Sequence, residues 1–363
     1  MKTYILIVVP VILALISSLL IIPVVIKWVN KKGLLVQLND RTSHNIPTPT
    51  MGGIGIFLGF LIVLPFITYN TEIITLFIGV AVLFVTGFID DCYDLKSLLK
   101  FAIQLGCASI IYWGGFRIDN LHGILGINEV PELVSCIVTI IFITGVTNAF
   151  NLIDGIDGLA GGISLINAFF FGLIFIMNDQ INFALIAFVL CGSILGFLKY
   201  NFSPAKIFMG DTGSLFLGLL MSVFMIKTFQ TNASAELSVA GSVVLIFIPV
   251  FDTIRLFADR ILNKKSPFLA DKNHLHHLVL RIIPKHAYAT LTILFLHGLL
   301  LMLTFMSFYL NSHVVLTTLI ALLILGVSLF LCIIIVVGLW GKVKLIKKMI
   351  KSKISKNIFL KNI

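Results

Sequence analysis

The sequence predicts an all-α protein, a polytopic membrane helix bundle with about eleven transmembrane helices. Of its 363 residues, 59% are hydrophobic and only 12% are charged, whereas soluble domains are typically about 45–50% apolar and about 25% charged. Many of the apolar runs also approach the roughly 20 residues that a membrane-spanning helix needs. The formal net charge of +10 does not indicate nucleic-acid binding, because the cations flank apolar runs instead of forming one basic face.

Eleven apolar runs follow one another along the chain. The first is interpreted as a retained span and not a signal peptide, because it is long, lacks a small-residue cleavage site and precedes three lysines. The fourth run is short, and Gly106 interrupts it. The expected spans are 4–29, 52–69, 73–89, 101–114, 133–149, 161–177, 182–198, 213–229, 237–255, 289–309 and 314–339.

The connecting loops fall into two classes by their content of lysine and arginine. Cations follow the first, third, seventh, ninth and last spans, whereas the other loops carry few, with Arg117 as the main exception. By the positive-inside rule the cationic loops are cytoplasmic, so the N-terminus is expected outside and the C-terminus in the cytoplasm. Residues 1–341 then form a single integral membrane domain, and residues 342–363 form a basic cytoplasmic tail that anchors the topology or contacts anionic lipid.

Acidic residues end the third apolar run. Asp90 and Asp91, followed by Asp94, lie where an acid in hydrocarbon costs about 2.5–3.5 kcal/mol, which favours a functional reason for them. On a helix, Asp90 and Asp94 share one face and Asp91 points about 100° away. The alternative is that these acids lie in headgroup water and only end the helix.

A second polar stretch, NAFNLIDGIDGLAGG at residues 148–162, places amides and carboxylates on neighbouring turns. Asn148, Asn151, Asp154 and Asp157 suit a hydrated Mg²⁺ and the polar groups of a nucleotide. The alternative interpretation is a polar helix cap at the membrane interface.

A third stretch, FMGDTGS at residues 208–214, precedes the eighth span. Asp211 or Thr212 can cap that helix. Free backbone N–H groups at a helix start also attract phosphate. A metal-bound Asp211 beside such donors would form a diphosphate site.

A fourth group is the histidine-rich loop of residues 271–277. It contains His274, His276 and His277, and Arg260 precedes it. Histidines among cations suit sugar hydroxyls and phosphates. A solvated interfacial loop is the alternative.

Four motifs in order, DDCYDLKSLLKFAIQ, NAFNLIDGIDGLAGG, IFMGDTGS and SPFLADKNHLHHLVLR, resemble the polyprenyl-phosphate N-acetylhexosamine-1-phosphate transferases, glycosyltransferase family 4. The resemblance runs from about Arg41 to Arg281 and agrees with that family's eleven helices. It implies one membrane transferase domain that moves a sugar 1-phosphate from a UDP-sugar to a polyprenyl phosphate, releasing UMP. It further implies Mg²⁺, or Mn²⁺ in its place, and an active site on the cytoplasmic face of the inner membrane. The partners are the two substrates and the lipid bilayer, not nucleic acid, and a homodimer is allowed.

Site residues follow from this resemblance together with the residue types. Asp90 and Asp91 match paired catalytic acids that act on the lipid phosphate, and Asp211 matches the metal-binding acid, with Asn151 as a further metal ligand. Phe208 lies where uracil stacks, and the histidine loop matches the part that recognises the sugar. The residues expected to bind the donor are Asn148, Asn151, Asp154, Asp157, Phe208, Arg260, His274, His276 and His277.

Two branches of the family differ in their sugar. The histidine loop, with Asp252, Arg255 and Arg260 before it, resembles the branch of undecaprenyl-phosphate N-acetylglucosamine-1-phosphate transferase. That branch starts glycans such as lipopolysaccharide O-antigen or teichoic acid linkage units. By contrast, TPTMGG at residues 48–53 resembles the phospho-N-acetylmuramoyl-pentapeptide transferases of peptidoglycan synthesis. The loop is given more weight, because it contacts the group that differs.

The expected chemistry is a single displacement on the sugar-side phosphorus. A phosphate monoester has a second pKa of about 6, so the acceptor is mostly a dianion and needs no strong base. Asp90 would orient it or take its last proton, and a two-step route through an aspartyl-phosphate is the alternative. An ion-coupled transporter is a further alternative from another class, but it predicts acids near mid-span rather than at span ends.

Overall fold

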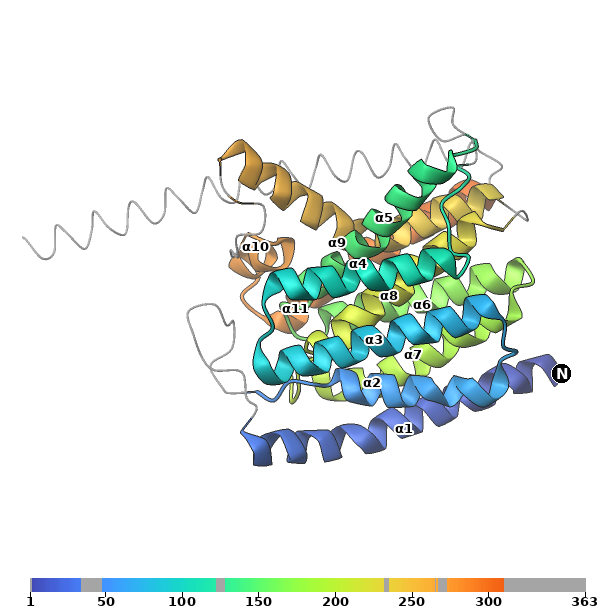
Figure 1. Ribbon diagram of the computed structural model, residues 1–363. Coiled ribbons are helices and arrows are strands. Elements are labelled where there is room, and N and C mark those ends of the chain that lie inside the picture. Colours follow the sequence, from blue (N-terminus) through green and yellow to red (C-terminus); the bar gives the residue numbers. More distant parts are fainter. Residues whose placement is uncertain are drawn as a thin grey trace, which may run out of the picture. The chain divides into compact units, whose positions relative to one another are not determined.

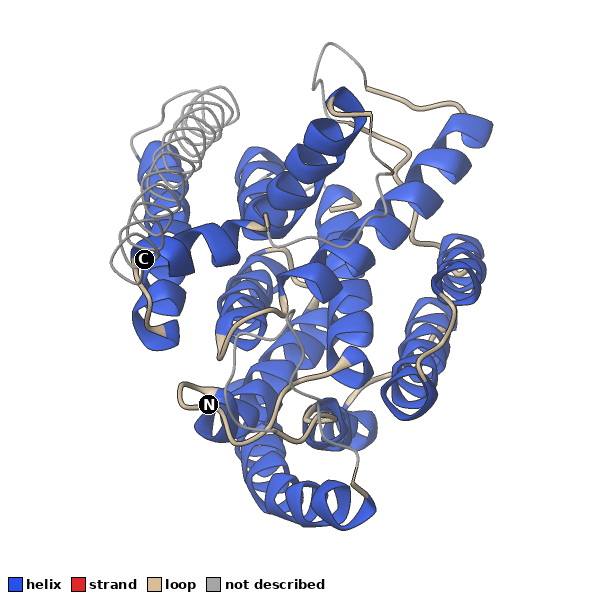
Figure 2. Ribbon diagram, turned by 90° about the vertical axis from the view of Figure 1, so that its left-hand side faces the viewer, coloured by secondary structure: helices blue, strands red, loops and turns tan. Residues whose placement is uncertain are grey.

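The computed structural model describes most of the chain, and the described residues are 2–33, 48–121, 128–231, 235–264, 266 and 273–309. The chain divides into two compact units, Met1–Thr318 and Leu319–Ile363, and all described residues belong to the first. They form helices joined by loops and contain no β-strand (Figure 2), and Asn120 and Glu129 form an isolated β-bridge. The expected span 314–339 and the tail 342–363 lie outside the described residues.

Eight of the helices in the described part are long and apolar enough to cross a membrane, so the predicted membrane helix bundle is confirmed (Figure 1). In chain order the elements are α1 Lys2–Lys32, α2 Gly53–Phe60, η1 Leu61–Phe66, α3 Thr71–Tyr93, α4 Ser97–Trp113, α5 Glu132–Ile153, α6 Leu159–Met177, α7 Ile181–Asn201, α8 Asp211–Phe229, α9 Ala235–Leu262, α10 Leu275–Ile282 and α11 His286–Tyr309.

Two expected spans are shorter in the structure than a typical membrane crossing. The span predicted at 52–69 is divided between α2 and the 3-10 helix η1, in which Pro65 supplies no backbone donor. The span predicted at 101–114 is α4, with 17 residues. The short helix α10 was not expected, and it arises inside the histidine-rich segment.

Helix α8 is the buried centre of the bundle. It packs against α2, α3, α5, α6 and α9, and all of its residues are buried except Asp211 and Lys227. This burial fits a sequence that is apolar on every face. The two charged residues lie in its first and last turns, where Asp211 pairs with Lys100 and Lys227 pairs with Glu72 at 2.6 Å.

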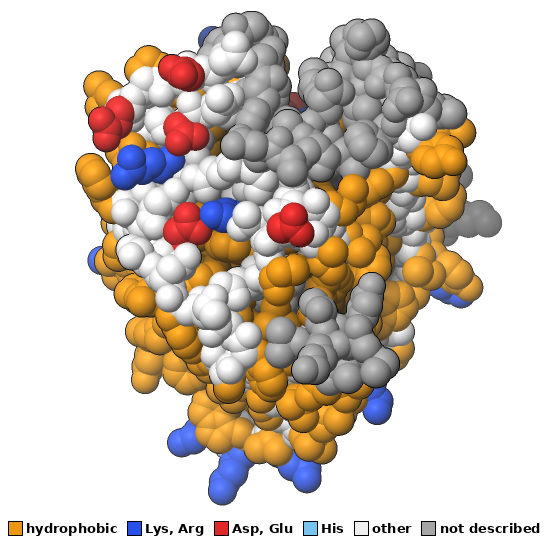
Figure 3. All heavy atoms as spheres, turned by 90° about the vertical axis from the view of Figure 1, so that its right-hand side faces the viewer, with side chains coloured by type: hydrophobic (Ala, Val, Ile, Leu, Met, Phe, Trp, Pro, Cys, Tyr) orange, Lys and Arg blue, Asp and Glu red, His pale blue; other side chains and the backbone are white. Residues whose placement is uncertain are grey.

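Successive helices bring distant sequence motifs to one end of the bundle. The last turns of α3 and α5 and the first turn of α8 meet there, because side chains from all three are in hydrogen-bonding contact. Figure 3 shows the side of the molecule that is at the right in Figure 1. Acidic side chains gather in the upper part of that face, which is the end of the bundle away from these turns. Lysine and arginine side chains lie both there and along its lower edge, and hydrophobic side chains dominate much of the rest.

The contact between α8 and α5 predicts a stability difference between two glycine variants. A methyl group on Gly218 would lie 2.7 Å from the Cα atom of Thr147 and 2.9 Å from its carbonyl oxygen. We expect Gly218→Ala to lower the free energy of unfolding by about 1–3 kcal/mol, as overpacking does. Thermal unfolding of the purified protein in detergent measures this.

Gly145→Ala is the matched control, because Gly145 lies on α5 and a methyl group there meets no atom within 4 Å. We expect this variant to lose no stability, since alanine favours a helix over glycine. Equal melting temperatures for the two variants would contradict the packing of α8 on α5.

Candidate active site

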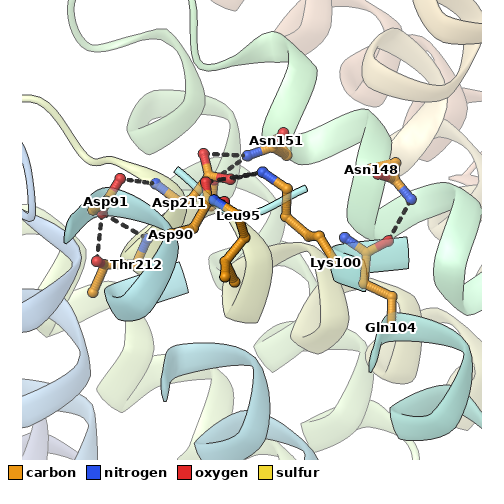
Figure 4. A network of polar contacts seen from close by, with 10 residues as sticks. Asp90, Asp91, Leu95, Lys100, Gln104, Asn148, Asn151, Asp211 and Thr212 are labelled. Carbon is orange, nitrogen blue, oxygen red and sulfur yellow. Dashed lines mark hydrogen bonds and ion pairs between the residues drawn. The ribbon is translucent and has the colours of Figure 1, made fainter. Parts of the chain in front are cut away.

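Four side chains from four helices form a polar cluster at the end of the bundle where α8 begins (Figure 4). The Lys100 ammonium lies 2.9 Å from Asp90 Oδ2 and 2.5 Å from Asp211 Oδ2. The Asn151 amide donates to Asp211 Oδ1 at 2.8 Å and to Ser214 Oγ at 2.9 Å. The cluster therefore joins α3, α4, α5 and α8 around one carboxylate, that of Asp211.

The turn after α3 explains how Lys100 reaches this cluster. Asp94 takes a left-handed conformation with φ 53°, which acids tolerate better than most residues. Its N–H donates to the Asp90 carbonyl, and the Leu95 N–H donates to Asp90 Oδ1 at 2.9 Å. The chain reverses, so α4 runs back along α3. Lys100 is one of the cations that follow the third expected span, where the sequence indicates only topology. The structural turn at Asp94 is what brings it to Asp90.

Asp91 contacts a different partner from Asp90, as their helical spacing predicts. Its carboxylate accepts the backbone N–H groups of Asp211 and Thr212. The N–H groups of Gly213 and Ser214 bond to the Gly210 carbonyl. The expectation that free N–H groups at the start of α8 bind phosphate is therefore wrong, because all of them have acceptors. Neither Asp211 nor Thr212 caps the helix with its side chain.

Asp154 follows α5 and lies beside the same helix start. Burial, and next the charges of Asp211 and Asp91, raise the pKa of the Asp154 carboxyl to about 7, although a hydrogen bond from the Gly210 backbone acts in the opposite direction. Asp154 is half-buried. The segment from Gly210 to Thr212 is thus held by carboxylates from two other segments.

Asn148 and Asp157 lie outside the four-residue cluster. Asn148 lies one turn before Asn151 on α5, and its amide donates to Gln104 Oε1 at 2.7 Å. Asp157 is buried, accepts the Ala205 N–H at 3.0 Å and pairs with His286 at 3.2 Å. Asp157 therefore connects the start of α6 with the loop before α8 and with the start of α11.

The histidine loop is fixed by an acid of α9. Asp252 accepts His274 Nδ1 at 2.9 Å and the Leu275 N–H at 2.9 Å, and it pairs with Arg255 at 2.8 Å. Asp252, Arg260 and His274 are all buried. The sequence shows Asp252 only as part of a pattern before the histidine loop, and the structure gives it a direct contact with His274.

His276 connects that loop to the stretch of residues 148–162. It is 1% exposed, and its ring lies directly against Gly155, where an added Cβ would collide with it. Burial, followed by the charges of His277 and His274, holds the pKa of His276 well below its usual value. The His277 ring lies 4.3 Å from that of His276, between ring centroids.

The main chain at Phe208 is hydrogen-bonded to the main chain of the segment TPTMGG, residues 48–53. The Phe208 N–H donates to the Pro49 carbonyl at 2.8 Å, and the N–H groups of Gly52 and Gly53 donate to the carbonyls of Phe208 and Met209. Phe208 is half-buried. Residues 48–53 therefore support the loop before α8 through main-chain contacts.

The carboxylates of the cluster are groups that bind cations, but the protein alone does not supply a full set of metal ligands there. In the described part of the chain, no group of three or more His, Cys, Asp or Glu residues could hold a metal ion. Lys100 shows that a positive charge is held between Asp90 and Asp211. Mg²⁺ usually takes one or two carboxylates and completes its shell with water and phosphate oxygens, which Asp211 fits. The Asn151 amide nitrogen faces Asp211, leaving its oxygen for another partner.

The raised pKa of Asp154 predicts a pH-dependent stability change. The folded protein binds this proton more strongly than the unfolded chain, so the contribution of Asp154 to the free energy of unfolding falls as pH rises from 3.8 to about 7. We expect Asp154→Asn to raise the melting temperature relative to the wild type at about pH 8, and not at about pH 4. Thermal unfolding with a chelator present measures this.

Asp119→Asn is the control, because Asp119 is exposed. This variant should leave the difference in melting temperature between about pH 4 and about pH 8 unchanged from that of the wild type. If Asp154→Asn stabilised the protein equally at both pH values, the assigned pKa would be refuted.

Comparisons with known proteins agree with this arrangement. Residues 73–229, which include α3 to α8, match the family model described as glycosyl transferase family 4. The chain is 34% identical over 291 residues to a probable undecaprenyl-phosphate N-acetylglucosaminyl 1-phosphate transferase of Bacillus subtilis, covering 79% of this chain and 81% of that protein. It is 32% identical to a decaprenyl-phosphate N-acetylglucosaminephosphotransferase of Mycobacterium leprae, over 73% and 74% of the two chains. It is 26% identical to the Escherichia coli K12 undecaprenyl-phosphate alpha-N-acetylglucosaminyl 1-phosphate transferase, over 70% and 71%. The predicted resemblance is confirmed, and the chain belongs to glycosyl transferase family 4.

Proposed function

We propose that this protein transfers N-acetylglucosamine 1-phosphate from UDP-N-acetylglucosamine to undecaprenyl phosphate and releases UMP. The observation that carries the proposal is the cluster of Asp90, Lys100, Asn151 and Asp211 at one end of an apolar bundle. The similar proteins, named as polyprenyl-phosphate N-acetylglucosamine-1-phosphate transferases, support the same reaction. A site at the membrane surface meets both a lipid phosphate and a soluble nucleotide sugar, and we place it on the cytoplasmic face of the inner membrane.

The reaction requires that negative charge be neutralised and reactants aligned, more than it requires covalent chemistry. Lys100 supplies a compact positive charge, which binds phosphate as a point charge. Its ammonium lies between two carboxylates, so a bound diphosphate would compete with Asp90 and Asp211 for it. Asp90 then faces the acceptor phosphate and orients it or takes its last proton.

Asp211 is the proposed ligand of Mg²⁺, with Mn²⁺ as its substitute and the Asn151 oxygen as a second candidate ligand. When bound, the ion would neutralise the diphosphate and stabilise the UMP that leaves. Asn151 and Ser214 orient the Asp211 carboxylate through their hydrogen bonds. Such contacts to a metal ligand fix its direction and are typically worth about 10–100-fold in affinity or activity.

The choice of N-acetylglucosamine over the muramoyl-pentapeptide donor rests on how the two discriminating segments are built. The TPTMGG segment engages its neighbours through main-chain atoms, so its side chains are a weak guide to the sugar. The histidine loop, held by Asp252, brings the His276 ring next to Gly155. We propose that this loop contacts the sugar and that the product starts a lipid-linked envelope glycan.

A transfer assay tests the proposal. Purified protein receives undecaprenyl phosphate, Mg²⁺ and either UDP-N-acetylglucosamine or UDP-N-acetylmuramoyl-pentapeptide, with UMP and lipid-linked sugar as readouts. We expect turnover with the first donor, loss of turnover with a chelator, and a fall of at least about 100-fold in kcat for Asp211→Asn, since a metal ligand supports several kcal/mol of charge stabilisation. Asp179→Asn, an exposed acid in the α6–α7 turn, is the charge-matched control.

Turnover with only the muramoyl donor would refute the assigned sugar and keep the reaction class. Turnover that survives complete chelation would refute the metal. If neither donor reacts and the protein instead carries an ion across vesicle membranes, the transporter alternative replaces the transferase.

A further inference from the structure

Helix α8 begins without a cap from its own side chains. The first N–H groups of a helix have no partner within the helix and need an acceptor from elsewhere. The residue before α8 is Gly210, with φ 73° and no side chain. In a buried helix an unpaired N–H group costs about 1–3 kcal/mol, so the acceptors at this position matter for where the helix can begin.

Asp91, from the last turn of α3, supplies those acceptors. Its Oδ1 accepts the Asp211 N–H at 3.0 Å, and its Oδ2 accepts the Thr212 N–H at 3.0 Å. The Thr212 hydroxyl donates to the same Oδ2 at 2.5 Å. Three donors from two consecutive residues therefore surround one carboxylate, as Figure 4 shows.

Gly210 makes room for this contact. A Cβ at Gly210 would collide with both carboxylate oxygens of Asp91, and its positive φ independently disfavours any other residue. The close approach of α3 to this helix start is seen again at Gly87, where an added Cβ would collide with the Asp211 backbone. The close packing at Gly210 and Gly87 thus fixes Asp91 next to the backbone of Asp211.

Asp90 and Asp91 are adjacent in sequence but have separate surroundings. Asp90 faces Lys100, while both oxygens of Asp91 are occupied by the start of α8. We infer that Asp91 is a positioning residue, which caps α8 and thereby fixes the place and direction of Asp211, and that only Asp90 of this pair acts on the substrate. This inference deepens the proposed function and relies on it for the role of Asp211.

Metal binding and hydrogen exchange test the inference without requiring turnover. Titration with Mn²⁺ alone, followed by electron paramagnetic resonance, gives the metal affinity, and hydrogen–deuterium exchange of the peptide that contains residues 208–215 reports on the helix start. We expect Asp91→Ala to weaken Mn²⁺ binding by about tenfold or more and to speed exchange in that peptide, because alanine cannot cap. Asparagine offers one acceptor oxygen where the carboxylate offers two, and its NH2 group would face a backbone N–H donor. We therefore expect Asp91→Asn to lie between the wild type and Asp91→Ala both in Mn²⁺ affinity and in exchange rate.

Asp90→Asn is the matched control. We expect it to lower kcat by at least about 100-fold with exchange of the α8 peptide unchanged, whereas any fall in kcat for Asp91→Asn should be accompanied by faster exchange of that peptide. If Asp91→Asn lost as much kcat as Asp90→Asn while Asp91→Ala left exchange and Mn²⁺ affinity unchanged, Asp91 would act on the substrate and the inference would be overturned.

A third variant covers the case in which Asp91→Ala does not fold. Thr212→Val removes the hydroxyl donor to Asp91 and leaves both backbone contacts. It should therefore speed exchange at the start of α8 less than the complete loss of the Asp91 carboxylate does. An unchanged exchange rate in both Thr212→Val and Asp91→Asn, with kcat abolished in Asp91→Asn, would also overturn the inference. A wild-type protein without transfer activity would refute the proposed function alone, since the exchange and Mn²⁺ results stand independently.

Discussion

The carboxylate of Asp91 at the start of α8 is the contact on which the site depends. α8 is buried along nearly its whole length, and its first backbone donors, which have no partner within the helix, need acceptors from elsewhere. Asp91 and the Gly210 carbonyl supply them. With the helix start fixed in this way, the side chain of its first residue, Asp211, projects toward Lys100 and Asn151. The fold and the candidate site therefore share one set of hydrogen bonds.

The same construction occurs at the histidine loop. The α10 helix also lacks a cap from its own first residue, and Asp252 of α9 accepts the Leu275 N–H together with His274 Nδ1. Asp157 connects a third pair of segments in a similar manner, through Ala205 and His286. The sequence indicates Asp91 and Asp157 as candidates for ligand binding and Asp252 as part of a pattern. In the structure, all three acids contact backbone groups of neighbouring segments. Asp90 and Asp211 face the one nearby lysine of the cluster, which is consistent with a role in handling phosphate.

Much of this arrangement follows from the sequence for clear physical reasons. The long apolar runs specify the spans, and the i, i+1 offset of Asp90 and Asp91 on a helix specifies that they face different partners. The sequence does not specify which face meets which neighbour, because that depends on helix packing. Lys100 was therefore missed as a site residue, since only the left-handed turn at Asp94 returns it to Asp90. The supposed phosphate-binding donors of α8 were misjudged for the same reason, because their acceptor comes from α3.

We propose that Asp211, held at the start of α8, is where a divalent cation and the donor diphosphate meet. Diffraction from crystals grown with Mn²⁺ and UDP-N-acetylglucosamine, collected at the manganese edge, locates the ion directly. We expect an anomalous peak about 2.1 Å from an Asp211 carboxylate oxygen, with Lys100 moved from Asp211 toward phosphate and Asp91 still on the N–H groups of α8. A peak on the histidine loop instead, or an ion bound by Asp91 with the start of α8 uncapped, would contradict it.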